Sequence, residues 1–489
     1  MAPTETYRHP LAVLRSRAGY THSEYARLIA DTHATLGYGH MAARREKVGR
    51  WEAGRVVPER TAQFAIAHVH GVPEEEVLSR SWPDWLHLAN GDGLLLELPW
   101  TASAVPEAIL DAVDGRNPAR QEYLLATGSA VGSLLDPWRD AMAESLAKAP
   151  AGSPPAHPEY GDPLTGHAPG PDGVPEACVR LRALTTFARN FSAGWLVAAL
   201  ELELGQLARQ LITETGACDG TGTRAGASRP DRAYPLALAA EGLTVCGFVT
   251  RLQGHHIKAQ RYYLAALRCA AAAADTGLAA VVLSLHSGQY LDLAMPDEAA
   301  ELLGAVETLL RRHPGPVAPA LVALQQAQLS RVHALRGDDL GRKRALVTGR
   351  RALTATSANA PATPPVDREG WLGLVEGVSE LDMDRPESAL RRFAPVLEER
   401  SLGLPPYVCA LYLLRAAEAQ TALGDTAAGA HTVHKVTALL GGTHQMAAAE
   451  EVRRAGRTHP YPPEPSQFRA ATPGRCRDIR SRPARSGRR

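Results

Sequence analysis

The chain has 489 residues, of which 45% are hydrophobic and 21% are charged, and its formal net charge is +1. This length is too great for one ordinary domain and predicts two to four domains with a sizeable core. The near-neutral balance excludes a protein that coats nucleic acid over its whole surface. Any contact with DNA therefore has to come from a local basic patch.

Cysteine spacing indicates neither a disulfide framework nor a structural zinc site. No two cysteines form a C-x-x-C pair, and none lies in a Cys/His cluster with the spacing of zinc ligands. Scattered cysteines of this kind are typical of reduced thiols inside a cytosolic protein. The six are Cys178, Cys218, Cys246, Cys269, Cys409 and Cys476.

Two observations predict a cytoplasmic protein with no membrane partner. Residues 1–10 are polar and lack the apolar segment of a secretory signal. The longest apolar stretches, 124–135 and 270–285, are short or interrupted by polar residues. Both fall below the roughly 20 residues that are needed to span a bilayer.

Short helical patterns with many charges fill residues 10–90. Apolar residues in Leu11–Ala18 fall on one face of a first helix. Thr21–Glu24 then has the pattern of a capping box, which satisfies the exposed N–H groups at the start of a second helix. Tyr20 and Tyr25 fit the hydrophobic staple that accompanies such a box, and this helix is expected to reach about Asp31.

A third helix is expected over residues 43–52, where Val48 and Trp51 have the spacing of core-facing positions. Its remaining faces are strongly basic. A fourth helix is predicted from Pro58 to Val69, and a fifth begins at Pro73. The basic positions of the third helix are Arg44, Arg45, Lys47 and Arg50.

Beyond residue 90, composition divides the chain into four further segments. Residues 91–148 are predicted as a helical connector, and the Pro/Gly-rich residues 149–175 as a linker. Residues 176–445 are rich in Ala and Leu with helical periodicity, interrupted by a flexible loop at 216–231. The basic segment 446–489 is predicted to be mostly disordered. Alternating β-branched runs are nearly absent, so the fold class is predicted as all-α.

The long helical segment contains a weak internal repeat. Similar breaks between helical runs recur at intervals of roughly 40 residues, as expected for stacked helical hairpins. Small residues at Ala299, Ala389 and Ala427 follow three of these breaks and are expected to let neighbouring helices approach closely. The pattern resembles tetratricopeptide-type repeats, although the period exceeds 34 residues and most consensus aromatics are missing; an irregular helical bundle is the alternative. The breaks lie at 252–254, 293–298, 335–338, 381–384 and 423–425.

A family resemblance emerges in residues 11–80. The run Lys47–Gly54, followed by Pro58, resembles the end of the recognition helix in the lambda-repressor/Cro-like (XRE) helix-turn-helix family, and Thr21–Glu24 resembles the start of its second helix. With the helical region behind it, the whole chain resembles actinomycete regulators of differentiation and antibiotic production. The chain departs from the family in the segment 31–42, which lengthens the turn between the second and third helices.

The resemblance implies double-stranded DNA as a partner and a helix-turn-helix domain over residues 1–90. Arg44, Arg45 and Lys47 then become candidates for contacts with base edges in the major groove. Phosphate contacts are expected from Thr21, His22 and Arg50. The alternative for these basic residues is a solvated helix face, whereas Trp51 is expected to pack in the core. These six DNA-binding candidates are Thr21, His22, Arg44, Arg45, Lys47 and Arg50.

The basic patch is small, because residues 44–60 hold six basic and three acidic side chains. One head is therefore expected to bind weakly, which predicts a homodimer on a two-part site. Residues 475–489 contain seven arginines and one aspartate. They are interpreted as a solvated end, with added nonspecific DNA affinity as the alternative.

No motif indicates an enzyme, a metal site or a cofactor. The Gly-rich stretch 220–226 has its last glycine one place too late for a dinucleotide fingerprint, and no strand precedes it. His255 and His256 are adjacent, so a helix would direct them to different faces. We expect a negative transcriptional regulator, whose helical repeats bind a peptide, a small molecule or a protein, or dimerise. The alternative is a protein-interaction scaffold that does not read DNA.

Overall fold

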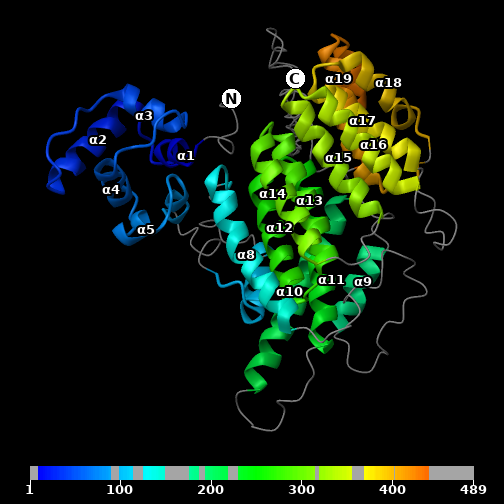
Figure 1. The fold of residues 1–489 in the computed structure, drawn as a ribbon, viewed down its shortest axis with the longest axis horizontal. Helices are drawn as coiled ribbons and strands as arrows, with labels where there is room; N and C mark the ends of the chain where they lie inside the picture. Colours follow the sequence, from blue (N-terminus) through cyan, green and yellow to red (C-terminus); the bar gives the residue numbers. More distant parts are fainter. Residues whose placement is uncertain are drawn as a thin grey trace, which may run out of the picture.

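The computed structural model describes residues 9–89, 98–113, 125–148, 176–186, 193–218, 230–313, 319–354, 368–400 and 402–439. All regular structure in these ranges is helical and no β-strand occurs among them, which confirms the predicted all-α class. The two large hydrophobic clusters among the described residues are separate. We call residues 9–89 the head and the rest, from residue 98 to 439, the body (Figure 1).

The head packs five short helices and a 3-10 turn around one core. Tyr25, Ile29, Val48, Ile66 and Trp85 are fully buried there. The second helix is longer than expected and continues beyond Asp31. The elements are α1 (Pro10–Arg17), α2 (His22–Thr35), α3 (Arg45–Glu52), α4 (Arg60–Val69), α5 (Glu74–Ser79) and η2 (Asp84–Leu88).

The start of α2 has the local structure that its sequence predicts. The Thr21 hydroxyl accepts a hydrogen bond from the backbone N–H of Glu24, while the Glu24 carboxylate accepts one from the backbone N–H of Thr21. The rings of Tyr20 and Tyr25 lie 6.2 Å apart across this turn. The capping box and its staple therefore fix where α2 begins.

The body begins with helices that share a core with everything after them. Ile109 and Trp138, from the predicted connector, are buried in the same cluster as the later helices. The predicted linker 149–175, most of the predicted loop 216–231 and the tail 446–489 lie outside the described residues. These first elements are η3 (Ala102–Ala104), α7 (Val105–Val113), α8 (Ser129–Lys148), α9 (Glu176–Thr186) and α10 (Ala193–Cys218).

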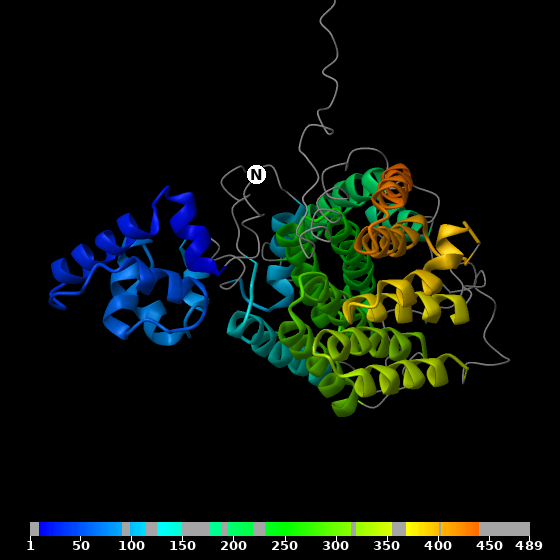
Figure 2. The same ribbon diagram turned by 90° about the horizontal axis from the view of Figure 1, so that it is seen from above.

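Ten further helices pair in sequence order into five hairpins, which we call the array and number 1 to 5 (Figures 1 and 2). Each of the five predicted breaks is the turn between the two helices of one hairpin. Seen from above, the hairpins follow a curved path that brings hairpin 5 back toward hairpin 1 (Figure 2). The pairs are α11 (Pro230–Leu252) with α12 (His256–Ala272), α13 (Thr276–Asp292) with α14 (Pro296–Arg312), α15 (Pro319–Leu335) with α16 (Asp339–Thr354), α17 (Arg368–Asp382) with α18 (Pro386–Leu397), and α19 (Pro406–Ala422) with α20 (Thr426–Leu439).

In four of the five hairpins, the fourth residue of the second helix is small and lies where the two helices pack closely. Ala259, Ala299 and Ala389 are fully buried there, as a close helix–helix approach requires. In hairpin 5 the position belongs to Gly429, where an added Cβ would lie 2.6 Å from the Thr421 hydroxyl. The expectation for Ala427 was wrong, because that residue lies in the first turn and is exposed.

Hairpin 3 has Arg342 at the equivalent position, and its side chain is 2% exposed. Its guanidinium pairs with Asp339 at 2.8 Å and with Glu380 of hairpin 4 at 2.9 Å. A buried guanidinium requires such partners because its desolvation is costly. The Arg342–Glu380 ion pair therefore joins hairpins 3 and 4.

Helix α11 is the one described helix that passes a length and apolarity test for a membrane span. The segment Arg232–Leu252 has a mean hydropathy of 1.3, but 78% of its apolar window is buried inside the body. A core helix passes the same test, so this placement is compatible with a soluble protein.

Replacing Ala389 with leucine is expected to destabilise the array by about 1–3 kcal/mol, because added methyl groups have no space between packed helices. The matched control is Ala427→Leu, which adds the same atoms at an exposed site and should change stability by less than about 0.5 kcal/mol. Urea unfolding followed by circular dichroism measures both. Equal effects of the two substitutions would contradict the assignment of the close-packed position.

Candidate nucleic-acid interface

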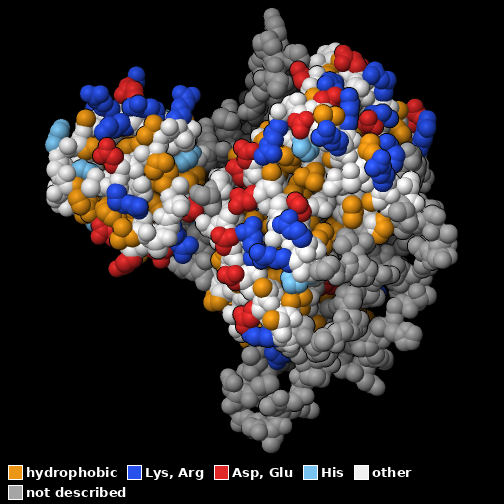
Figure 3. Space-filling model, viewed as in Figure 1, with side chains coloured by type: hydrophobic (Ala, Val, Ile, Leu, Met, Phe, Trp, Pro, Cys, Tyr) orange, Lys and Arg blue, Asp and Glu red, His pale blue; other side chains and the backbone are white. Residues whose placement is uncertain are grey.

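Helix α3 has one face locked into the head and the other exposed. Val48 is fully buried and Trp51 is 6% exposed, and both pack in the head core as predicted. The opposite face therefore points outward. Figure 3 shows Lys and Arg side chains gathered on the edge of the head that carries α3 in Figure 1.

The predicted base-reading residues lie at the start of this helix. Arg44 is the N-cap residue of α3 and Arg45 its first residue, and both side chains are exposed. Lys47 is half-buried and Arg50 is exposed. Arg45 pairs with its neighbour Glu46 at 3.1 Å, but both side chains are more than 60% exposed. Such a pair is weak and leaves the guanidinium accessible.

The end of α3 is fixed by a buried ion pair that sequence reasoning missed. Glu52, at the last residue of α3, accepts hydrogen bonds from Arg15 Nε at 2.6 Å and Nη2 at 3.2 Å. Arg15 also donates to the backbone oxygen of Tyr20 at 2.6 Å. Both charged side chains are 9% exposed. A two-point guanidinium–carboxylate contact of this kind sets orientation as well as distance, so it fixes α3 relative to α1.

The two predicted phosphate contacts at the start of α2 have other partners in this structure. The Thr21 hydroxyl accepts the capping hydrogen bond from Glu24. The Nε2 atom of His22 lies 2.9 Å from the second carboxylate oxygen of Glu52, although the His22 side chain remains 46% exposed. The structure therefore brings His22 next to the end of α3 through Glu52. The sequence shows an acidic residue at the end of the third helix and an arginine in the first helix, but no pattern in it pairs these residues with each other or with His22.

The segment 31–42 adds a turn to α2 and then packs against the head. Tyr38 stacks on Phe64 of α4 with ring centroids 5.9 Å apart, and its hydroxyl donates to Glu74 of α5 at 2.7 Å. His33 Nδ1 lies 3.0 Å from the backbone oxygen of Gly39. Gly37 and Gly39 have φ of +81° and +85°, a conformation that glycine adopts without strain. The insertion is thus a specific loop fixed to α4 and α5.

Within the described residues, no group of three His, Cys, Asp or Glu side chains is arranged to hold a metal ion. His255 is exposed whereas His256 is buried, so the two adjacent imidazoles diverge. Cys178, Cys246 and Cys269 are buried and Cys409 is half-buried, and none of these four is in a disulfide. The Gly-rich stretch 220–226 lies outside the described residues.

Replacing Glu52 with glutamine is expected to destabilise the head by about 3–5 kcal/mol, because it leaves the buried Arg15 guanidinium without a counter-charge. Glu46→Gln is the matched control on the same helix, where an exposed pair should contribute less than about 1 kcal/mol. Hydrogen exchange of the backbone amides of α1 and α3 in the full chain measures the loss of head stability in both variants. A small loss in the Glu52 variant would show that the pair does not anchor α3.

Acid is expected to destabilise the head. Burial, the dominant cause, lowers the pKa of His9, His70 and His87 from 6.5 to about 4 in each case. The folded head thus takes up fewer protons than the unfolded chain below pH 6.5, and stability is lost progressively between pH 6.5 and about 4. At pH 5 each such histidine costs about 2 kcal/mol. The melting temperature of the head should fall from pH 7.5 to 5, and less so in His87→Leu; equal falls would contradict this cause.

No family model, no curated protein sequence and no solved structure matches the chain. The similarity to XRE-type proteins therefore rests on the residues of the head alone.

Proposed function

We propose that the protein is a sequence-specific DNA-binding transcriptional regulator. The observation that supports this most is the two-sided character of α3. Its apolar side is held by the core and its last residue by the Arg15–Glu52 pair, while Arg44 and Arg45 extend from its exposed first turn. A rigid helix with basic groups at its exposed N-terminal end suits insertion into a major groove.

The chemistry of the exposed side chains divides the contacts by type. Guanidinium and ammonium groups of Arg44, Arg45 and Lys47 match the O6 and N7 acceptors of guanine, and a good two-point contact discriminates by about 1–3 kcal/mol. Arg50 lies further along the helix and suits a backbone phosphate, as does the exposed ring of His22. The Thr21 side chain acts on α2 through its cap, so its contribution to DNA binding is positional.

The array supplies the second half of the proposal. Five stacked, tetratricopeptide-like hairpins present extended surfaces for dimerisation or for a peptide, small-molecule or protein partner. A homodimer places two heads on a two-part site, which compensates for the small basic patch of each head. The resemblance to actinomycete regulators suggests repression of differentiation or antibiotic production in the cytoplasm. We propose no enzymatic step.

One observation favours a second function, a protein-interaction scaffold without DNA reading. Glu52 neutralises the buried Arg15 and contacts His22, so Arg15 adds no net positive charge to the basic patch of α3. We favour the regulator because the scaffold hypothesis gives no role to the exposed basic groups of Arg44 and Arg45.

Replacing Arg44, Arg45 and Lys47 together by alanine is expected to lower affinity for the preferred DNA by at least about 100-fold, since two or three base contacts are lost. The full chain is titrated with a library of genomic DNA fragments at two salt concentrations. The wild-type chain should enrich particular fragments and bind them more weakly at the higher salt.

A matched control removes the same amount of charge from the array, through Lys343, Arg344 and Arg351, which are exposed on α16. This triple alanine variant should keep its fragment preference. Enrichment of no fragment by the wild-type chain, or equal losses in the two variants, would contradict groove reading by α3 and favour the scaffold.

A further inference from the structure

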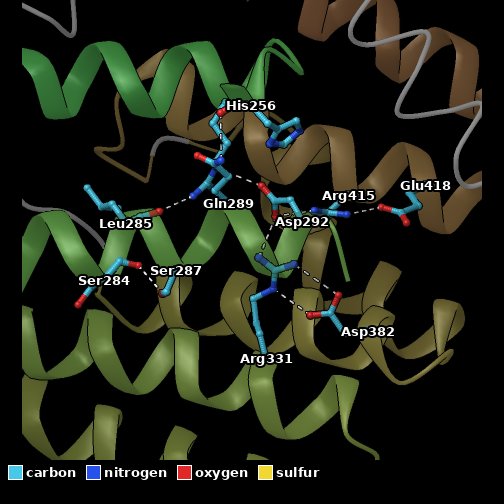
Figure 4. A network of polar contacts seen from close by, with 11 residues as sticks. His256, Ser284, Leu285, Ser287, Gln289, Asp292, Arg331, Asp382, Arg415 and Glu418 are labelled. Carbon is cyan, nitrogen blue, oxygen red and sulfur yellow. Dashed lines mark hydrogen bonds and ion pairs between the residues drawn. The ribbon is translucent and has the colours of Figure 1, made fainter. Parts of the chain in front are cut away.

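Hairpin 5 makes a contact that an open stack of hairpins does not allow. In a solenoid each repeat contacts only its neighbours. Here Arg415 of α19 places Nη2 2.7 Å from Oδ1 of Asp292 on α13, which belongs to hairpin 2 (Figure 4). The two residues are 123 positions apart in sequence. This ion pair thus joins hairpins 2 and 5 directly, across the inside of the curve.

A second contact joins the two ends of the array. Phe248 of α11 in hairpin 1 meets Tyr407 of α19 in hairpin 5 edge to face, with ring centroids 5.8 Å apart. The Arg251 guanidinium lies 4.9 Å from the centre of the Phe248 ring. Both of these contacts are made by the far ends of long side chains. They join hairpin 5 directly to hairpins 1 and 2.

Asp292 is the point at which these contacts meet. Besides Arg415, it pairs with Arg251 Nε at 3.1 Å and with Arg331 Nη1 at 3.0 Å, and Arg331 pairs in turn with Asp382 at 2.8 Å (Figure 4). The first helix of every hairpin contributes one member of this group. All five side chains are between 2% and 9% exposed.

The charges of this group show which residue joins hairpin 5 to the other hairpins. Arg251, Arg331, Asp292 and Asp382 alone are balanced, two against two, and link hairpins 1 to 4. Arg415 adds a third positive charge from hairpin 5, and it also pairs with Glu418 of its own helix at 2.7 Å, which is 24% exposed. Without Arg415 the four remaining charges stay paired, and Glu418 stays in contact with water. The Arg415–Asp292 contact is therefore separable from the rest.

We propose that Arg415–Asp292 and Phe248–Tyr407 form a clasp that holds the array in a closed ring, and that its release lets hairpin 5 swing away from hairpins 1 and 2. In the closed ring, side chains of α11 and α13 contact side chains of α19. This inference is independent of DNA binding by the head.

The test compares the full-length wild-type chain with Arg415→Met, which keeps the length of the side chain and removes its charge. Hydrogen exchange and small-angle X-ray scattering are measured on both. We expect amide exchange in α19 and α20 to rise by at least about 10-fold and the radius of gyration to increase, while exchange in α13 to α16 stays the same. Tyr407→Leu should produce the same pattern through the other half of the clasp.

The matched control is Lys435→Met in the same hairpin. Lys435 pairs with Glu399 at 2.7 Å on the outside, where the carboxylate is 74% exposed. This variant should leave exchange and radius unchanged. Unchanged exchange and radius in Arg415→Met would overturn the clasp. So would exchange that rises equally in α11 to α20, because Arg415 would then serve stability of the whole array instead of closure.

Discussion

Asp292 is a carboxylate that the array removes from water and surrounds with three guanidinium groups. Burial alone would raise its pKa, but Arg251, Arg415 and Arg331 together hold the pKa well below its usual range. The group remains charged, and each arginine around it depends on that charge. The three arginines come from hairpins 1, 3 and 5, so the positions of these hairpins are fixed relative to the two carboxylate oxygens of Asp292. The curvature of the array follows from this constraint as much as from the packing of small residues in the hairpins.

The head uses the same physical device on a smaller scale. Glu52 closes α3 as Asp292 closes α13, and in both cases a buried arginine from another helix supplies the counter-charge. A charge pair fixes orientation more sharply than apolar contact, which tolerates sliding. In the head this holds the exposed basic turn of α3 in a defined direction.

A physical link between the two units exists at α8. Ser133 of α8 donates a hydrogen bond to Asp84 of η2 at 2.9 Å, and the backbone N–H of Gly128 donates to Glu298 of α14 at 3.1 Å. Glu301 of α14 lies close to Gly132, where an added Cβ would be 2.6 Å from its carboxylate oxygen. Hairpin 2, which also carries Asp292, therefore contacts the helix that contacts the head.

The sequence by itself determined what depends on near neighbours. The all-helical class, the capping box at Thr21, the core positions Val48 and Trp51, and the five turns of the array follow from periodicity and capping chemistry, which act over a few residues. It also placed the basic residues at the exposed start of α3. Only the tertiary structure decided which charges meet. Arg15 with Glu52, and Arg415 with Asp292, are separated by 37 and 123 positions, and a single sequence gives no signal for pairs at such distances. The sequence also gives no signal for which of Ala427 and Gly429 packs against the first helix of hairpin 5. These two small residues lie two positions apart, and only the orientation of the packed helix makes one exposed and the other buried.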